Sequence, residues 1–118
     1  MINFKPEIVK ILKKITNNVS ETYPDDWTKL PIIIYEEENN TPHTTTSVGE
    51  SMTLLRYRID IYSNESTSVL KSKINDEMTS AGFTRAFSLD TNDISNRRHT
   101  IMRYEGVIDL DNNKIYKN

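Results

Sequence analysis

Two histidines and a few carboxylates are the side chains of this sequence that could carry acid–base or metal chemistry. His43 and His99 are far apart, and neither has a second histidine or a cysteine at the spacing of a zinc-ligand pair, so we expect no zinc site. Asp60, Glu105 and Asp109 could converge on neighbouring strands as the paired carboxylates that general acid–base catalysis uses. Charges on the surface of a sheet are the simpler interpretation of the same three residues.

The acidic run Glu36–Glu38 offers carboxylate oxygens, the ligands that hard divalent cations prefer. The solvated end of a strand explains this run with fewer assumptions. No serine lies in a Gly-x-Ser-x-Gly turn, and none of the 3 glycines begins a phosphate-binding loop at the start of a helix. The sequence therefore predicts neither an enzyme nor a bound cofactor or metal.

Two segments have the apolar spacing of amphipathic helices. The first runs from Lys5 to about residue 22, with Asn3 as a possible N-cap and Pro24 beyond its end. The second follows Ser63, a possible N-cap, and ends at Gly82, which can adopt the left-handed conformation that closes many helices. The residues expected on its buried stripe are Val69, Leu70, Ile74, Met78 and Ala81.

Four segments are typical of β-strands. Leu30–Tyr35 is β-branched, and Thr53–Tyr62 alternates strictly between apolar and polar residues, which indicates a half-buried strand. Phe83–Leu89 and Arg98–Leu110 follow the second helix, with turn residues between them. Gly106, inside the last of these strands, indicates a bulge or the close approach of another backbone.

A long polar loop is expected over residues 36–52, between the first two strands. It is longer than an ordinary hairpin needs, and it has little apolar surface with which to pack. The segment is either a floppy hairpin arm or an arm that becomes ordered on a partner. On the second interpretation, the candidate partner-binding residues are Glu36, Glu37, Glu38, His43 and Glu50.

The order helix, strand, strand, helix, strand, strand predicts an α+β fold over a single domain, residues 1–118, with a short C-terminal tail at 111–118. We expect a four-stranded mixed or antiparallel sheet with both helices packed on one face. Its other face would keep a set of charges that could pair with a neighbouring subunit, each exposed pair contributing less than about 1 kcal/mol. These candidate subunit-interface residues are Arg56, Arg58, Arg103 and Glu105.

Composition narrows the classes of protein further. A chain of 118 residues has the size of one domain, and its net charge of −2 disfavours tight binding to nucleic acid. The absence of cysteine excludes disulfides and thiolate sites, which fits assembly inside a cell. No secretion signal and no run of about 18 apolar residues is visible, so we expect neither export nor a membrane partner.

Four short segments carry a resemblance to a known family. They are Tyr57–Tyr62, Met78–Phe83, Thr84–Arg85 and Arg103–Gly106. Over roughly residues 53–110 the chain resembles the tail-terminator, or tail-completion, proteins of long-tailed bacteriophages and related particles.

The resemblance implies a structural virion protein without catalytic activity. Such proteins assemble as a homo-oligomeric, typically hexameric ring on the last ring of the tail tube, stop tube growth and provide the docking surface for head-completion or connector proteins. DNA would pass through the lumen without specific binding. The location implied is the head–tail interface of the virion tail, after assembly in the host bacterial cytoplasm. A head–tail connector, neck or tube protein without length control is one alternative, and a small intracellular enzyme or ligand-binding domain is another.

Overall fold

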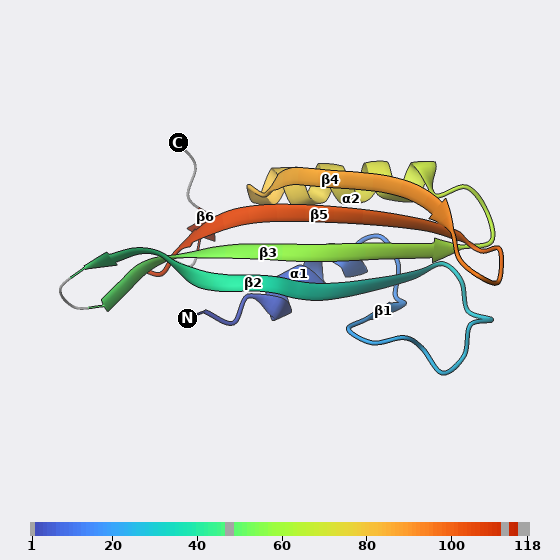
Figure 1. Ribbon diagram of the computed structural model, residues 1–118, viewed down its shortest axis with the longest axis horizontal. Coiled ribbons are helices and arrows are strands. Elements are labelled where there is room, and N and C mark those ends of the chain that lie inside the picture. The colour runs from blue at the N-terminus through green and yellow to red at the C-terminus, as the bar shows by residue number, and fades with distance from the viewer. Residues whose placement is uncertain (1, 47–48, 112–113, 116–118) are drawn as a thin grey trace.

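The computed structural model describes residues 2–46, 49–111 and 114–115 (Figure 1). Residues 47–48 of the expected loop, and 112–113 and 116–118 of the expected tail, lie outside the described residues. The helices are α1 (Lys5–Lys13) and α2 (Ser68–Ala81). The strands are β1 (Val19–Ser20), β2 (Ile32–Thr46), β3 (Gly49–Ser63), β4 (Thr84–Asn92), β5 (Arg98–Asp109) and β6 (Lys114–Ile115).

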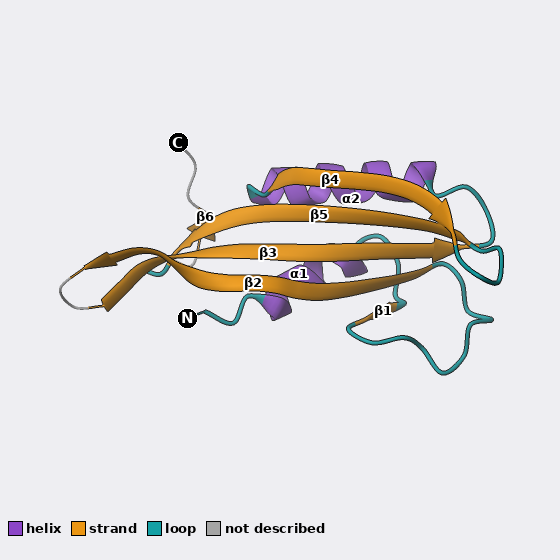
Figure 2. Cartoon of the chain, in the orientation of Figure 1, coloured by secondary structure: helices purple, strands orange, loops and turns teal. Residues whose placement is uncertain are grey.

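The fold is α+β, as expected, with two helices and one mixed sheet (Figure 2). Five strands follow the order β1-β2-β3-β5-β4, and β6 pairs with β5 beside this path. The four long strands are antiparallel to their neighbours, whereas the short β1 runs parallel to β2. The four expected strands are β2, β3, β5 and β4, and the sheet also contains β1 and β6, which sequence periodicity did not indicate.

The first helix ends at Lys13, well before the expected boundary near residue 22. Residues 16–18 are Thr-Asn-Asn, which form helices poorly because their side chains compete for backbone hydrogen bonds. The hydroxyl of Thr16 accepts such a bond from the Asn18 amide at 3.3 Å. Beyond this turn, the Ile33 amide donates to the Asn18 carbonyl at 2.9 Å, so the chain joins the sheet as β1.

The second helix begins at Ser68 rather than directly after Ser63. Ser63 accepts a hydrogen bond from the Glu65 amide at 3.1 Å, which closes a local turn instead of capping the helix. Val69, expected on the buried stripe, lies in the first turn of the shorter helix and is 64% exposed. Gly82 does end the helix with φ at +106°, as expected.

Both helices cover one face of the sheet, and the core lies between these layers (Figures 1 and 2). The alternation expected of β3 is confirmed, since Leu55, Tyr57, Ile59 and Ile61 are fully buried on the helix side. Tyr104 on β5 is equally buried, and its burial raises the pKa of that phenol to about 12. In contrast, all nine residues of β4 are exposed, because β4 is an edge strand of the sheet.

Gly106 lies on β5 directly opposite Leu55, in an unbroken register. The expected bulge is therefore absent at this position. The close approach is real, but it involves the Phe83 side chain rather than another backbone. A Cβ atom at Gly106 would lie 2.8 Å from Cδ1 of the Phe83 ring, so only glycine leaves room for this aromatic side chain.

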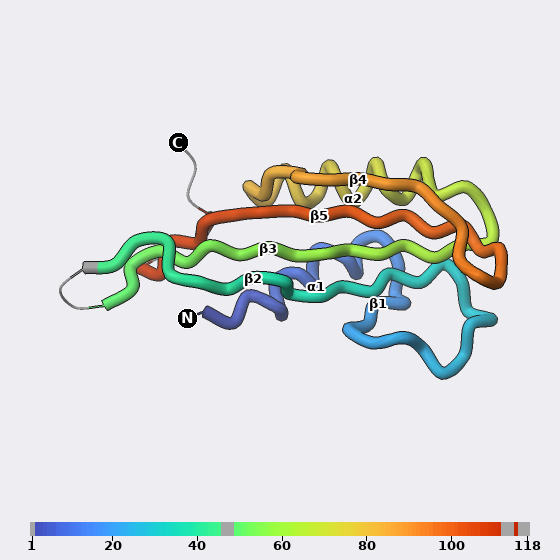
Figure 3. Tube along the Cα trace, viewed as in Figure 1, coloured from blue at the N-terminus to red at the C-terminus, as the bar shows by residue number. Residues whose placement is uncertain are grey.

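The prediction of a long polar loop at 36–52 is wrong for the described residues. They form strand instead: β2 extends to Thr46, and β3 begins at Gly49. The two strands pair as far as Thr46 and Gly49, which satisfies backbone groups without requiring apolar side chains. The threonines at the end of β2 also favour a strand, because β-branched residues fit a sheet well. Register shifts occur after Glu37, Pro42 and Thr44, and the paired end of β2 and start of β3 project beyond β4 and β5 (Figure 3).

Candidate functional site

The face of the sheet turned away from the helices carries the charges that the sequence indicated. We call it the open face. Since opposite residues of paired strands share a face, the register across β2, β3, β5 and β4 shows which side chains are neighbours there. One row across the strands is Glu36, Arg58, Arg103 and Phe87. The next row is Ile34, Asp60, Ile101 and Leu89.

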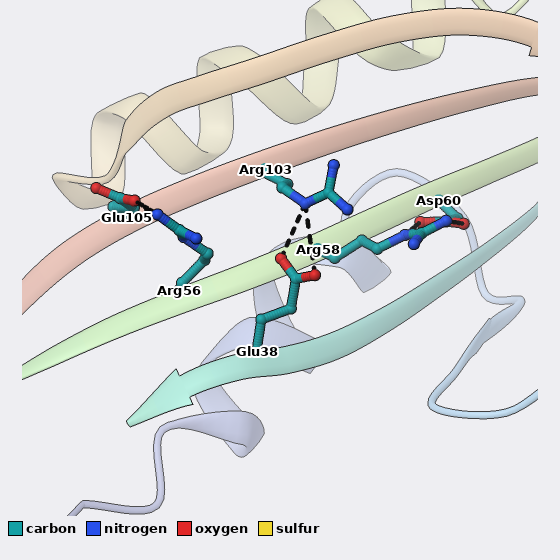
Figure 4. A network of polar contacts seen from close by, with 6 residues as sticks. All are labelled: Glu38, Arg56, Arg58, Asp60, Arg103 and Glu105. Carbon is teal, nitrogen blue, oxygen red and sulfur yellow. Dashed lines mark hydrogen bonds and ion pairs between the residues drawn. The ribbon is translucent and has the colours of Figure 1, made fainter. Parts of the chain in front are cut away.

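The four candidate interface residues do come together on the open face, and each is bound to a carboxylate or cation of the same chain (Figure 4). Arg56 pairs with Glu105 across strands, and its Nε donates to Oε1 at 2.9 Å. Arg103 Nε donates to Oε1 of Glu38 at 3.0 Å. The three arginines are therefore paired within the chain itself, whereas the sequence pattern suggested charges left to pair with a neighbouring subunit.

The ion pairs of Figure 4 form a network on the open face, and Asp60 is its most buried carboxylate, with a side chain that is 9% exposed. The sequence pattern did not predict that Asp60 would be buried there. Arg58 donates two hydrogen bonds to Asp60, from Nε to Oδ1 at 2.8 Å and from Nη2 to Oδ2 at 3.0 Å. These bonds raise the pKa of Arg58 above its ordinary value. The available signal was the spacing of Arg58 and Asp60, because residues two apart on a strand point to the same face.

His99 completes the group around Asp60. Its Nε2 lies 2.9 Å from Oδ2 of Asp60, and the imidazole stacks on the Tyr62 ring with 4.1 Å between centroids. Among the described residues no hydroxyl forms a hydrogen bond with His99, so the histidine and carboxylate lack the nucleophile of a catalytic triad. The contacts fix the orientation of the His99 ring between Asp60 and Tyr62.

Trp27 lies at the edge of this group. Its ring is 5.0 Å from that of Tyr62, and the guanidinium of Arg97 lies 4.2 Å from the Trp27 centroid. Asp93 in turn binds Arg97 at 2.8 Å. The tryptophan thus anchors the segment before β2 against the turn between β4 and β5.

The five candidate partner-binding residues do not form one site. Glu36 lies on the open face opposite Arg58, whereas Glu37 faces the helices and accepts a hydrogen bond from the Tyr57 hydroxyl at 2.8 Å. Glu38 belongs to the ion-pair network, and His43 and Glu50 lie farther along the hairpin. Strand alternation and the shift after Glu37 separate residues that are adjacent in the sequence.

A polar cavity of about 310 Å³ lies beside His99, between the start of α2, the end of β4 and the start of β5. Its lining includes Ser66, Ser68, Asp90 and Arg98. One carboxylate and one guanidinium among hydroxyl groups suit a small polar molecule, but they do not select one reaction.

No group of three or more histidines or carboxylates within residues 2–46, 49–111 and 114–115 is placed to hold a metal ion. In the same part of the chain, neither helix has the length and apolar character needed to cross a bilayer. Compared with models of known protein families and with curated protein sequences, the chain matches none.

Proposed function

We propose that the protein is a structural tail terminator, which caps the tail tube of a long-tailed phage or phage-like particle as a hexameric ring. The observation that carries this proposal is the open face, a charged sheet surface that the two helices do not cover and that the segment of Tyr23 and Trp27 covers only at one end. Sheets of α+β domains bury one face on their helices, so the second face is available for neighbours. The segments that resemble the family lie on β3, β5 and the connection from α2 to β4.

The open face also suits a surface near DNA that must slide. Arg56, Arg58 and Arg103 are each bound to a carboxylate, so they have little capacity left to grip phosphates. The net charge of −2 acts in the same direction. DNA would then pass through the ring without specific binding, while the tube protein and a head-completion protein bind the two sides of the ring at the head–tail interface.

To test the proposal, the gene is silenced during particle production in the host bacterium, and tail lengths are then measured by negative-stain electron microscopy. A terminator predicts overlong tails without heads, because tube growth no longer stops. Restoring the wild-type gene from a plasmid should return the normal length. Intact particles with normal tails would overturn the proposal.

A connector or neck protein without length control is the alternative from the same particle. It predicts tails of normal length that are detached from heads in the same micrographs. The alternative of an enzyme or ligand-binding domain rests on the cavity beside His99 and predicts particles that assemble normally.

Replacing Arg103 and Glu105 together by alanine is expected to weaken ring assembly on tails while leaving the monomer folded. Both side chains are substantially exposed, so losing their ion pairs costs less than about 1 kcal/mol each. Circular dichroism melting measures the fold, and the fraction of particles with normal tails measures assembly.

The matched control removes an exposed ion pair from the opposite side of the molecule. Lys14 on the segment after α1 and Glu77 on α2 lie 3.2 Å apart, and both can be replaced by alanine. Equal tail assembly by the two double variants would show that the open face is not an assembly surface.

A further inference from the structure

The edge strand β4 exposes both backbone and apolar side chains. Within the described part of the chain it pairs with β5 alone, and all nine of its residues are exposed. Phe87 and Leu89 are 41% and 47% exposed, respectively. Edge strands are usually protected by charged residues, prolines, bulges or short length. In β4 the charges are Arg85 and Asp90 and the register shift lies between Arg85 and Phe87, so the stretch Phe87–Leu89 between them has none of these protections and is open to another strand.

The two apolar side chains share the open face, because Phe87 lies opposite Arg103 and Leu89 opposite Ile101. Ser88 and Asp90 lie opposite Met102 and Thr100, on the helix side. An incoming strand continues the same sheet, so its side chains must match this alternation. A second β4 can meet the requirement only in registers that place open-face residues opposite open-face residues.

One antiparallel register places the apolar side chains of both strands opposite one another. With Ser88 opposite the Ser88 of a second copy, Phe87 of each chain faces Leu89 of the other, which forms a four-residue apolar cluster across the junction. Shifting the register by two residues toward the C-terminal end places Phe87 opposite the polar Thr91 instead. Contacts between large apolar side chains directly opposite each other stabilise the pairing of neighbouring strands.

The charges of β4 fit the same arrangement. Arg85, which donates to Asn75 at 3.1 Å, lies near the start of the strand, and Asp90, which already pairs with Lys71 at 2.6 Å, lies near its end, both on the helix side. Antiparallel pairing places the start of one strand beside the end of the other, so each arginine approaches the aspartate of the partner copy. A parallel arrangement would bring like charges together at both ends.

We propose that two free copies of this chain associate through their β4 edges about a two-fold axis at Ser88, forming one continuous sheet. Closed two-fold dimers with a self-complementary surface are the most common oligomers of soluble chains. The inference goes beyond the ring proposed above and does not depend on it, since it concerns the chain before it meets a tail.

Sedimentation velocity across a range of protein concentrations tests the association. The wild-type chain should approach twice the mass of 13.7 kDa, and Leu89→Lys should remain at the monomer mass because the lysine faces the apolar cluster. Val69→Lys is the matched control, since Val69 is 64% exposed on α2 and is not part of the β4 edge, so this variant should dimerise like the wild type. Circular dichroism must show all three proteins folded. A wild-type monomer at every concentration would overturn the proposal.

Cysteine cross-linking tests the register, without background because the chain contains no cysteine. Ser88→Cys is expected to give a disulfide dimer on mild oxidation, since directly opposite residues bring their Cβ atoms to disulfide range. Ser80→Cys, an exposed serine near the end of α2, should remain monomeric under the same treatment. Equal cross-linking of the two variants, or a dimer that Ser88→Cys does not trap, would exclude a two-fold axis at this residue.

Discussion

Replacing Gly106 by alanine is expected to lower the free energy of unfolding by about 1–3 kcal/mol, as overpacking of a well-packed core does. The new Cβ would lie 2.8 Å from Cδ1 and 2.9 Å from Cε1 of Phe83. That ring cannot move freely, since it is 2% exposed and packs edge-on against Phe4 and Tyr57. Alanine is otherwise the better residue in an extended strand, so a loss of stability must come from this contact. Urea unfolding measures it.

The control is the same substitution in a Phe83→Leu background. The smaller, more flexible leucine can withdraw from position 106, so Gly106→Ala should cost clearly less there, with a coupling energy above about 0.5 kcal/mol. Additive effects of the two substitutions would mean that the Phe83 ring does not constrain this position.

Replacing Asp60 by alanine is expected to lower the free energy of unfolding by about 1–3 kcal/mol, because its partners lose a charged acceptor on a buried surface. His99 is most affected, since its side chain is 11% exposed and its Nε2 bond to Asp60 cannot readily be replaced by water. The Arg58 side chain, at 30% exposed, can turn toward solvent. Urea unfolding at neutral pH checks the expected loss.

Glu38→Ala is the matched control, because it also removes one carboxylate from an arginine on the open face. The Glu38 and Arg103 side chains are 26% and 31% exposed, so this pair should contribute less than about 1 kcal/mol. If both variants lose the same small amount, Asp60 is a surface charge like the others rather than the centre of a buried network.

The sequence alone was sufficient to predict features that depend on residues close together in the chain. Strict alternation predicted the buried side of β3, and apolar spacing predicted both helices, although α1 ends earlier and α2 begins later than expected. Gly82 was identified as a helix terminator because a left-handed residue is a local requirement. Periodicity also predicted that Arg56, Arg58, Arg103 and Glu105 share one face.

The tertiary structure decided which segments pair and which charges meet. Glu38 reaches Arg103, 65 residues away, only because β2 and β5 flank β3, and this strand order has no local signal. The polar segment after Tyr35 is a strand because β3 satisfies its backbone, although it contributes few apolar side chains to the core. Likewise, β4 has a strand sequence whichever position it takes, and only the sheet order makes it an exposed edge. Local patterns report the face on which a residue lies, whereas partners are set by the packing of the whole chain.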